Sequence, residues 1–307
     1  MAHTRIAFLI LPQLHLIDLA GPLQVFHEAI EMGADLSIDY CSNGEELITP
    51  SQFPIGKLKH FTELKLAAGD YLFVPGSLTS YLVSKKLASQ KELFAWVRTQ
   101  HANGVNICSV CTGAFFLAQA GLLNGRKCTT HWQKTAELKQ RFPAINLVED
   151  VLFTDDDGIY TSAGVTSGID LALFLVSKLT NENISYNVAR ELVVYVRRRG
   201  SESQHSIYMK HRNHIHSGIH KAQDYLQENL KQKVSLSQLA DSACMSVRNL
   251  TRTFKKETGI TVNEYTSLLR KELLKRLSAN PGVNRKQMAM QCGLKSERQV
   301  IRLLKTV

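Results

Sequence analysis

"VNICSVCTGAFFLAQAG", residues 105–121, decides the fold of the first half of the chain. An apolar, β-rich run ends at Cys111, and a helical pattern of Ala, Phe and Leu follows at once. A strand that turns sharply into a helix is the repeating unit of α/β folds. Cys108 and Cys111 stand three residues apart, and His131 follows twenty residues later. The pattern is open to three interpretations: a catalytic site, a redox or metal motif, or a binding pocket.

The same alternation of strand and helix continues towards the N-terminus. Short apolar runs predict buried parallel strands, and they lie at 5–11, 35–42 and 70–76. Helical patterns separate them, one beginning near Asp18 and closed by Gly33, another at 89–104. This alternation predicts an α/β fold with a doubly wound, mostly parallel sheet and helices on both of its faces.

Residues 151–164 differ, because two short strand patterns flank the Asp-Asp-Asp-Gly run that ends at Gly158. That pattern predicts a β-hairpin. Two helices are expected next, at 166–180 and 182–199. The α/β domain is therefore predicted to cover residues 1–197.

Residues 198–216 lose this periodicity and are polar, basic and rich in histidine, which predicts a linker. The histidines in and beside it raise the question of a metal site; they are His205, His211, His214, His216 and His220. No single helix face collects them with carboxylate or thiol partners, so we favour a basic linker and expect no metal.

The remaining residues, 217–307, predict an all-α domain. Its first helix places Ile219, Ala222, Leu226 and Leu230 on one apolar stripe. A short helix, a turn at Cys244 and a second helix follow. Ser246 is expected to cap this second helix, which should bury Val247, Leu250 and Phe254. The side chains expected to face outward are Arg248, Asn249, Thr251, Arg252 and Lys255.

A similar unit recurs forty to fifty residues later. A short helix and a Cys-Gly turn precede Ser296, which is expected to cap a helix presenting Arg298, Gln299, Arg302 and Lys305. A helix-turn-helix with polar, basic residues outward fits the major groove of DNA. Two such units in tandem predict a domain that binds double-stranded DNA.

The distribution of charge supports this prediction. The net charge is +10, but residues from 196 onward hold 22 Lys/Arg against 8 Asp/Glu, whereas residues 1–195 hold 15 against 19. Only the C-terminal part therefore favours a polyanionic partner. The apolar run near the N-terminus is too short to span a membrane, and no cleavage site follows it. Six scattered cysteines do not form a disulfide framework. We therefore expect a cytoplasmic protein.

The C-terminal domain resembles the DNA-binding domain of AraC/XylS transcription regulators. The matching elements are "LADSACMSVRNLTRTFK" (239–255), "GITVNEY" (259–265), "LLRKELLKRL" (268–277) and "MAMQCGL" (288–294). That family usually continues beyond the second unit with a Gly, a Ser/Thr-Pro and a last short helix, and the given sequence ends at Val307. Leu294, Val300 and Leu304 stand where the family usually has phenylalanine, so the second unit is expected to have a smaller core and to bind DNA more weakly.

The N-terminal domain resembles the ThiJ/PfpI group of class I glutamine-amidotransferase-like proteins. The matching stretches are "LPQLHLIDLAGPLQVF" (11–26), "FVPGS" (73–77), "VCTGAFFLAQAGLLNGRKCTTHW" (110–132) and "TSAGVTSGIDLALFLV" (161–176). The resemblance implies a flavodoxin-like sheet. In this fold Cys111 would stand on a strained elbow in a cleft at the carboxyl ends of the strands.

The resemblance also implies which residues line that cleft. Asp18 occupies the position where the group often has a glutamate that hydrogen-bonds the elbow thiol, and His131 would approach Cys111. The helix N-terminus after Cys111 is expected to lower the pKa of its thiol. Backbone N–H groups near the elbow would contact a ligand or a developing oxyanion; the residues concerned are Gly76, Ser77, Thr112 and Gly113. Cys108 is expected to be buried and inert, and Cys41, Cys128, Cys244 and Cys292 to be core residues.

Three functions are compatible with these residues. The first is a transcription regulator, a homodimer through its α/β domain, that senses an unknown small-molecule effector. By resemblance, amino-acid-derived or quaternary-amine metabolites are suitable effectors. The second is a cysteine-dependent enzyme, an isonitrile hydratase or hydrolase, with a DNA-binding tail. The third is a redox sensor acting through Cys111. The fused DNA-binding domain favours the first, with no cofactor.

Overall fold

The computed structural model describes residues 3–44, 47–56, 58–194, 198–204, 210–212, 214–278 and 283–305. The chain divides into two compact units, Met1–Gln204 and His205–Val307. Their boundary falls inside the segment predicted to be a linker. No helix in the described ranges is long and apolar enough to cross a membrane.

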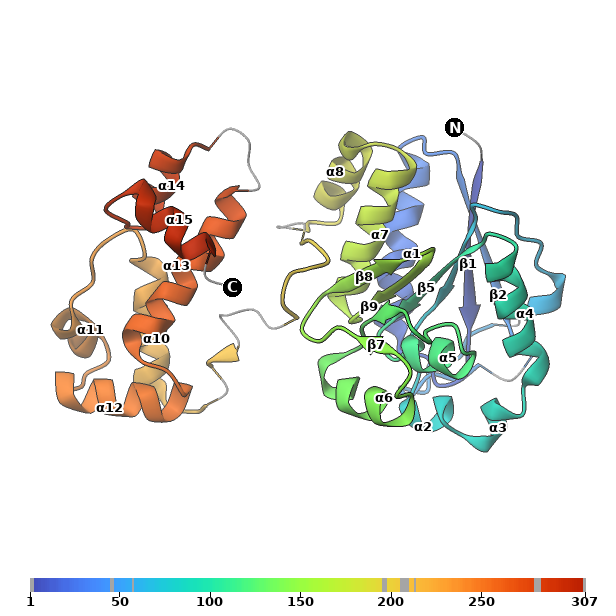
Figure 1. The fold of residues 1–307 in the computed structure, drawn as a ribbon, viewed down its shortest axis with the longest axis horizontal. Coiled ribbons are helices and arrows are strands. Elements are labelled where there is room, and N and C mark those ends of the chain that lie inside the picture. Colours follow the sequence, from blue (N-terminus) through green and yellow to red (C-terminus); the bar gives the residue numbers. More distant parts are fainter. Residues whose placement is uncertain are drawn as a thin grey trace. The chain divides into compact units, whose positions relative to one another are not determined.

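The first unit is built on a seven-stranded sheet, ordered β3-β2-β1-β4-β5-β9-β8 (Figure 1). Its strands are β1 (Thr4–Ile10), β2 (Leu36–Ser42), β3 (Lys59–His60), β4 (Tyr71–Val74), β5 (Asn106–Val110), β8 (Phe153–Asp156) and β9 (Ile159–Ser162). All neighbouring strands pair in parallel except β8 and β9. The predicted doubly wound, mostly parallel sheet is confirmed.

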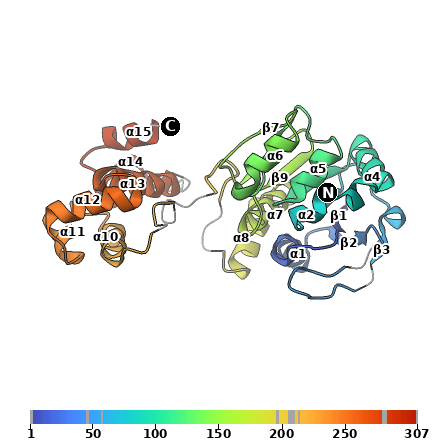
Figure 2. The ribbon, with the colours of Figure 1, turned by 90° about the horizontal axis from the view of Figure 1, so that it is seen from below.

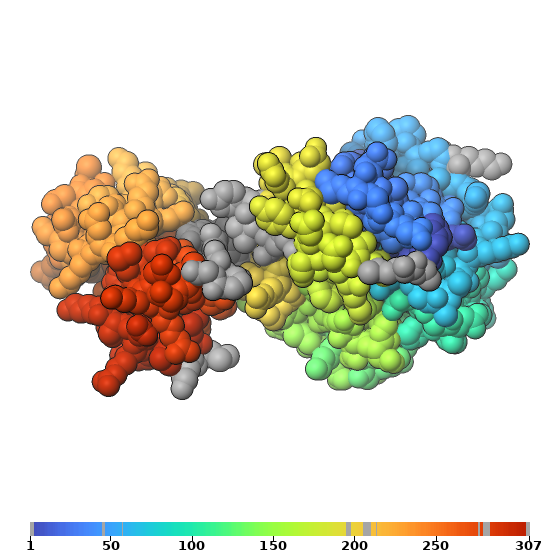
Figure 3. All heavy atoms as spheres, turned by 90° about the horizontal axis from the view of Figure 1, so that it is seen from above, coloured from blue at the N-terminus to red at the C-terminus, as the bar shows by residue number. Residues whose placement is uncertain are grey.

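Helices cover both faces of this sheet. Residues alternate along β1, so Ile6 and Phe8 point into one apolar cluster while Ala7 and Leu9 point into another. Residues of three helices complete the first cluster: α1 (Leu16–Glu31), α7 (Thr166–Leu179) and α8 (Glu182–Glu191). These helices lie side by side in Figures 2 and 3. Residues of α4 (Lys91–Ala102) and α5 (Gly113–Gln119) contribute to the second cluster, on the opposite face of the sheet. Every central strand is therefore buried on both faces.

Shorter elements complete the unit. They are η1 (Phe61–Glu63), α2 (Thr79–Leu82), α3 (Lys85–Ala88), η2 (Trp132–Lys134), α6 (Thr135–Arg141) and the paired strands β6 (Lys127–Cys128) and β7 (Asn146–Leu147).

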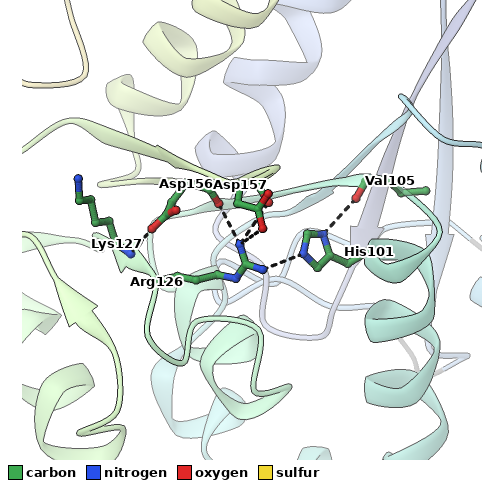
Figure 4. A network of polar contacts seen from close by, with 6 residues as sticks. All are labelled: His101, Val105, Arg126, Lys127, Asp156 and Asp157. Carbon is green, nitrogen blue, oxygen red and sulfur yellow. Dashed lines mark hydrogen bonds and ion pairs between the residues drawn. The ribbon is translucent and has the colours of Figure 1, made fainter.

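The predicted hairpin is formed by β8 and β9, with Asp157 and Gly158 between them. Both have positive φ, 50° and 74°, as a two-residue type I′ turn requires. Arg126 donates to the Asp157 carboxylate at 2.8 Å, and the Lys127 N–H donates to Asp156 Oδ2 at 2.6 Å (Figure 4). The guanidinium also lies 3.5 Å from His101 Nε2. These contacts attach the hairpin to β6, the strand that leads towards His131.

The end of the first unit differs from expectation. The helix predicted at 182–199 ends at Glu191, and residues 195–197 lie outside the described residues. Residues 198–204 then pack on the α/β unit instead of forming part of a free linker. Arg198 Nε donates to buried Asp170 at 3.0 Å, and the Gly200 carbonyl accepts from the Leu152 N–H at 2.8 Å.

The second unit is all-helical, as predicted. Its helices are α10 (Ser217–Glu228), α11 (Leu236–Ser242), α12 (Val247–Thr258), α13 (Val262–Ser278), α14 (Arg285–Gln291) and α15 (Glu297–Lys305). The pairs α11–α12 and α14–α15 are the two expected helix-turn-helix units, and α13 connects them. The predicted apolar stripe on α10 is buried in the core of the first pair.

The two helix-turn-helix units have cores of different size. Phe254 and Tyr265, both fully buried, pack edge to face in the first core with ring centroids 5.5 Å apart. The second core has smaller members, among them Leu274, Cys292 and Val300. Two predictions were wrong: Val247 is 40% exposed instead of buried, because it lies at the free first turn of α12, and the Cys244 side chain is exposed.

Some of the predicted linker residues also pack on the second unit. The ring of His214 stacks on that of His220 with centroids 4.3 Å apart, and His216 caps α10 by accepting from the Ile219 N–H. His211 Nδ1 lies 2.9 Å from the Thr258 carbonyl. Residues 205–209, which include His205, lie outside the described residues.

Candidate functional site

Cys111 stands at the turn between β5 and α5. Its φ is +57°, a strained conformation for a residue with a side chain, so the predicted elbow is present. The turn is held from two sides. The Cys111 N–H donates to the Ser162 carbonyl at 2.9 Å, and its carbonyl accepts from Thr130 Oγ1 at 2.8 Å. Neighbouring segments therefore keep the thiol at the carboxyl end of β5.

Two glycines make room for this elbow. Gly164 has a φ of +89°, and a Cβ there would lie 2.2 Å from the Cβ of Cys111 and 2.7 Å from its sulfur. At Gly76 a Cβ would lie 2.4 Å from Asp18 Oδ2 and 3.0 Å from Cys111 Cβ. Both positions exclude any side chain, because real Cβ atoms do not approach so closely.

Asp18 lies beside Cys111 and is fully buried in the first turn of α1. Its Oδ1 accepts from the N–H of Val165 at 2.7 Å, a bond that stabilises a β-branched residue with φ of +52°. Its Oδ2 accepts no hydrogen bond from the described residues, although His15 Nδ1 lies 3.5 Å away. One carboxylate oxygen is therefore structural, and the other faces His15 and Cys111.

This environment raises the pKa of the Cys111 thiol well above its usual value. Burial is the largest cause, and the negative charge of Asp18 adds to it. A hydrogen bond from the Thr112 backbone acts in the opposite direction but does not compensate. The predicted lowering of this pKa was wrong, because desolvation outweighs the helix N-terminus.

A cavity of about 440 Å³ opens over the thiol. Its lining combines two imidazoles, hydroxyl groups, an ammonium group and aliphatic side chains: His15, Leu78, Thr79, Ser80, Cys111, Thr112, His131, Gln133, Lys134 and Val165. A pocket of this volume accommodates a small metabolite. Cys111 and His131, which the sequence predicted to lie near each other, both line it.

The four residues predicted to bind ligand fall into two groups. Thr112 lines the cavity. The N–H of fully buried Ser77 donates to Thr112 Oγ1 at 3.1 Å, so it is directed at that hydroxyl. A Cβ at Gly113 would lie 2.2 Å from the Val74 carbonyl oxygen, so this glycine, like Gly76, permits close packing. Their ligand-binding roles stay predictions.

The wall that carries His131 is connected to the segment leaving the first unit. His131 Nδ1 accepts from the Gln133 N–H at 3.4 Å, and the preceding residue, Thr130, supports Cys111. Gln204 Nε2 donates to the Thr130 carbonyl at 3.1 Å. Gln204 is the last residue of this unit, so the cavity wall is hydrogen-bonded to the end of the first unit's chain.

Sequence reasoning missed His15, Gly164 and Val165. His15 precedes Asp18 by three residues at the start of α1, a spacing that brings both side chains to one side of a helical turn. That spacing was visible in the sequence. The other two come close to Asp18 and Cys111 only through the tertiary fold.

The remaining cysteines follow the prediction with one exception. Cys41, Cys108, Cys128 and Cys292 are buried, and burial raises the pKa of each thiol. They are core residues. Cys244 is exposed, with φ of +54°, in the turn between α11 and α12.

The second candidate site is the outer surface of α12. The predicted cap is confirmed, because Ser246 Oγ accepts from the Asn249 N–H at 3.3 Å. Arg248, Arg252 and Lys255 are exposed cationic residues of this surface, and Lys256 is exposed beside them. Arg252 Nη2 donates to the half-buried Asn249 Oδ1 at 3.3 Å, and Thr251 Oγ1 donates to the Val247 carbonyl.

The outer surface of α15 is similar. Ser296, Arg298 and Arg302 are exposed, and Gln299 is half-buried with its Oε1 accepting from the Lys295 N–H at 2.7 Å. Each helix-turn-helix unit thus presents arginines from its second helix. The capping role of Ser296 stays a prediction.

Comparisons with known protein families match both units. The sequence model of the DJ-1/PfpI family matches residues 4–178, and that of the bacterial regulatory helix-turn-helix proteins of the AraC family matches residues 226–267. The first match covers more than half of the chain and includes Asp18, Cys111 and His131. The second covers α11 and α12.

Among curated relatives, the transcriptional regulator GbdR of Pseudomonas aeruginosa is 28% identical over 209 residues, 67% of this chain and 56% of the relative. The match therefore spans little more than half of that regulator's length. CdhR of the same organism is 25% identical over 231 residues, 75% of this chain and 67% of the relative. Isonitrile hydratase of Pseudomonas putida is 29% identical over 189 residues, 61% of this chain and 77% of the enzyme.

Solved structures resemble the α/β unit. A ThiJ/PfpI family protein from Pseudomonas syringae superposes with a TM-score of 0.55 at 26% identity, covering 68% of this chain and 81% of that one. An AraC family transcriptional regulator from Pseudomonas putida superposes with a TM-score of 0.54 at 22% identity, covering 62% of this chain and 99% of that one. The second likeness shows the fold alone.

Proposed function

Since the chain belongs to the DJ-1/PfpI family and carries an AraC-type helix-turn-helix segment, we propose that it is a transcription regulator that binds specific DNA sequences and senses a small metabolite. The observation that carries this proposal is the pair of helix-turn-helix units, each with exposed arginines on its second helix. Regulators such as GbdR and CdhR among the relatives support it. We further propose a cytoplasmic homodimer that assembles through the α/β unit.

The cavity over Cys111 is the proposed effector site. A ligand there contacts the wall formed by His131, whose neighbour Thr130 hydrogen-bonds both the Cys111 carbonyl and, through its own carbonyl, Gln204. Ligand binding that shifts this wall changes the bond to Gln204. The signal thereby reaches the segment that leads to the DNA-binding helices.

The two recognition helices are expected to contribute unequally to DNA binding. Arg252→Ala should weaken binding to the operator by about 1–3 kcal/mol, roughly 5- to 150-fold, because a long side chain that reaches base edges is lost. Arg302→Ala should cost less, because the smaller core of its unit holds α15 less firmly. The measurement is a titration of each variant on selected operator DNA and on scrambled DNA at one salt concentration.

The matched control is Lys221→Ala, which removes one exposed cation from α10, outside both helix-turn-helix units. It should weaken binding to both DNAs by a similar small factor. Equal losses on operator and scrambled DNA for Arg252→Ala would mean that Arg252 only holds phosphates. A larger loss for Arg302→Ala would reverse the ranking of the two units.

A cysteine-dependent enzyme is the second candidate function. The strained elbow at Cys111, with Asp18 beside it and His131 on the same cavity, favours it, as does the likeness to isonitrile hydratase. The raised pKa of the thiol counts against it, because the neutral thiol is a poor nucleophile.

Cys111→Ala separates the two functions. In a sensor, this variant should still be stabilised by the effector, since a ligand at a hundred times its Kd raises the free energy of unfolding by about 2.7 kcal/mol without any turnover. Stabilisation is measured as the thermal shift of the full chain in a metabolite screen. Isonitrile hydration by the purified protein that disappears in Cys111→Ala would establish the enzyme instead.

A further inference from the structure

Three potential metal ligands from two separate segments come together beside the cavity; His15 and Cys111 line it, and Asp18 is buried next to them. Cys111 Sγ, a ring nitrogen of His15 and a carboxylate oxygen of Asp18 all lie within 4.8 Å of one another. We propose that these three side chains bind one thiophilic divalent cation of the Zn²⁺ class. The proposal concerns the cavity of the α/β unit and does not depend on DNA binding by the second unit.

The distances suit a tetrahedral ion. Zn²⁺ binds nitrogen and oxygen ligands at about 2.0–2.2 Å, so two such ligands at a tetrahedral angle are about 3.3–3.5 Å apart. His15 Nδ1 and Asp18 Oδ2 are 3.5 Å apart. These atoms therefore already have the separation of one edge of a metal tetrahedron.

Asp18 provides the independent reason to place a cation here. Its side chain is 1% exposed, and Oδ2 accepts no hydrogen bond from the described residues. A buried carboxylate oxygen whose polar neighbours are the His15 ring, 3.5 Å away, and the Cys111 thiol is poorly satisfied, and a bound cation satisfies it. The second oxygen accepts from the Val165 N–H at 2.7 Å, which fixes the orientation of the carboxylate as outer contacts do in metal sites.

The cavity supplies the room for a fourth ligand. Gly76 packs against Asp18 Oδ2 so closely that no side chain fits there. Three protein ligands leave one tetrahedral position, and two of them, His15 and Cys111, line the cavity of about 440 Å³. A thiolate with an imidazole and a carboxylate favours Zn²⁺ over Mg²⁺ or Ca²⁺, which prefer oxygen ligands.

Co²⁺ is the probe, because it reports thiolate coordination directly. The full-length protein, reduced and freed of metal with a chelator, is titrated with Co²⁺. We expect one equivalent to produce a near-ultraviolet sulfur-to-cobalt band and the visible bands of a tetrahedral ion, and Zn²⁺ to remove both. Cys111→Ser should abolish the sulfur band, and His15→Ala should raise the Kd at least about tenfold.

Two control variants complete the experiment. Cys244→Ser removes the exposed cysteine, and His27→Ala removes an exposed histidine of α1; both should bind Co²⁺ like the wild type. Absence of the sulfur band in the wild type overturns the proposal. So does a band that survives Cys111→Ser, or an unchanged Kd in His15→Ala, whose side chain is one-third exposed. Each of these results leaves the test of DNA binding by Arg252→Ala unaffected.

Discussion

Replacing Gly164 by alanine should lower the free energy of unfolding of the α/β unit by about 2–5 kcal/mol. Two costs combine. The residue has a φ of +89°, where a side chain costs about 1–2 kcal/mol. The new methyl group would also lie 2.2 Å from Cys111 Cβ, and such overpacking costs about 1–3 kcal/mol. Cys111 cannot easily move away from the new methyl group, because Ser162 and Thr130 hydrogen-bond its backbone.

Tryptophan fluorescence during urea denaturation of the full chain measures this effect selectively. Both tryptophans, Trp96 and Trp132, belong to the first unit, so their emission reports the unfolding of that unit alone. Gly33→Ala is the matched control, because Gly33 has nearly the same φ, +88°, and no atom within 4 Å of an added Cβ. Equal losses in the two variants would show that the contact with Cys111 relaxes at no cost.

Phe254→Ala should destabilise the first helix-turn-helix unit by about 3–5 kcal/mol, the usual cost of removing a buried phenylalanine. Phe254 is fully buried. Tyr265 packs against its ring, and Leu250 lies one helical turn away in the same core. A loss of this size is a large fraction of the free energy of unfolding of a small domain. The variant should therefore lose DNA binding and part of its helical circular dichroism while its tryptophan emission stays unchanged.

Val300→Ala is the comparison in the second unit. Val300 is also fully buried, but alanine removes only two methyl groups, so we expect a loss of roughly 2 kcal/mol. Circular dichroism at the helical band follows both variants during denaturation. A loss for Val300→Ala that equals or exceeds that of Phe254→Ala would contradict the conclusion that the first unit has the stronger core.

Local patterns in the sequence were sufficient for most of the elements. The apolar strands β1, β2, β4 and β5, the hairpin at Asp157-Gly158 and the buried stripe of α10 are all visible in patterns of residues a few positions apart. The same holds for the capping of α12 by Ser246. The sequence also predicted that Asp18, Cys111 and His131 belong to one region, through motifs characteristic of a family.

The sequence-based predictions were less successful where a segment packs against another that is distant along the chain. The helix expected to reach residue 199 ends at Glu191, and residues 198–204 return to the α/β unit through the bond of Arg198 to Asp170. The periodicity of the sequence gives no sign of this contact. A polar, basic stretch is typical of a linker, and only the structure shows that one of its residues has a buried partner. Cys244 was expected in the core because cysteine is usually buried, but its turn exposes it.

By itself the sequence determined the succession of strands and helices along the chain and the two units, since periodicity, turn residues and capping act over short distances along the chain. The elbow at Cys111 followed from the resemblance to a family. Only the tertiary structure decided the character of the site. It places His15 and Asp18, from the start of α1, beside Cys111 and Gly164, which lie about 90 to 150 residues further on. Burial and the charge of Asp18 then raise the pKa of the thiol, against the expected effect of the helix N-terminus. Desolvation and close contact depend on which segments surround an atom, and no local pattern specifies those neighbours.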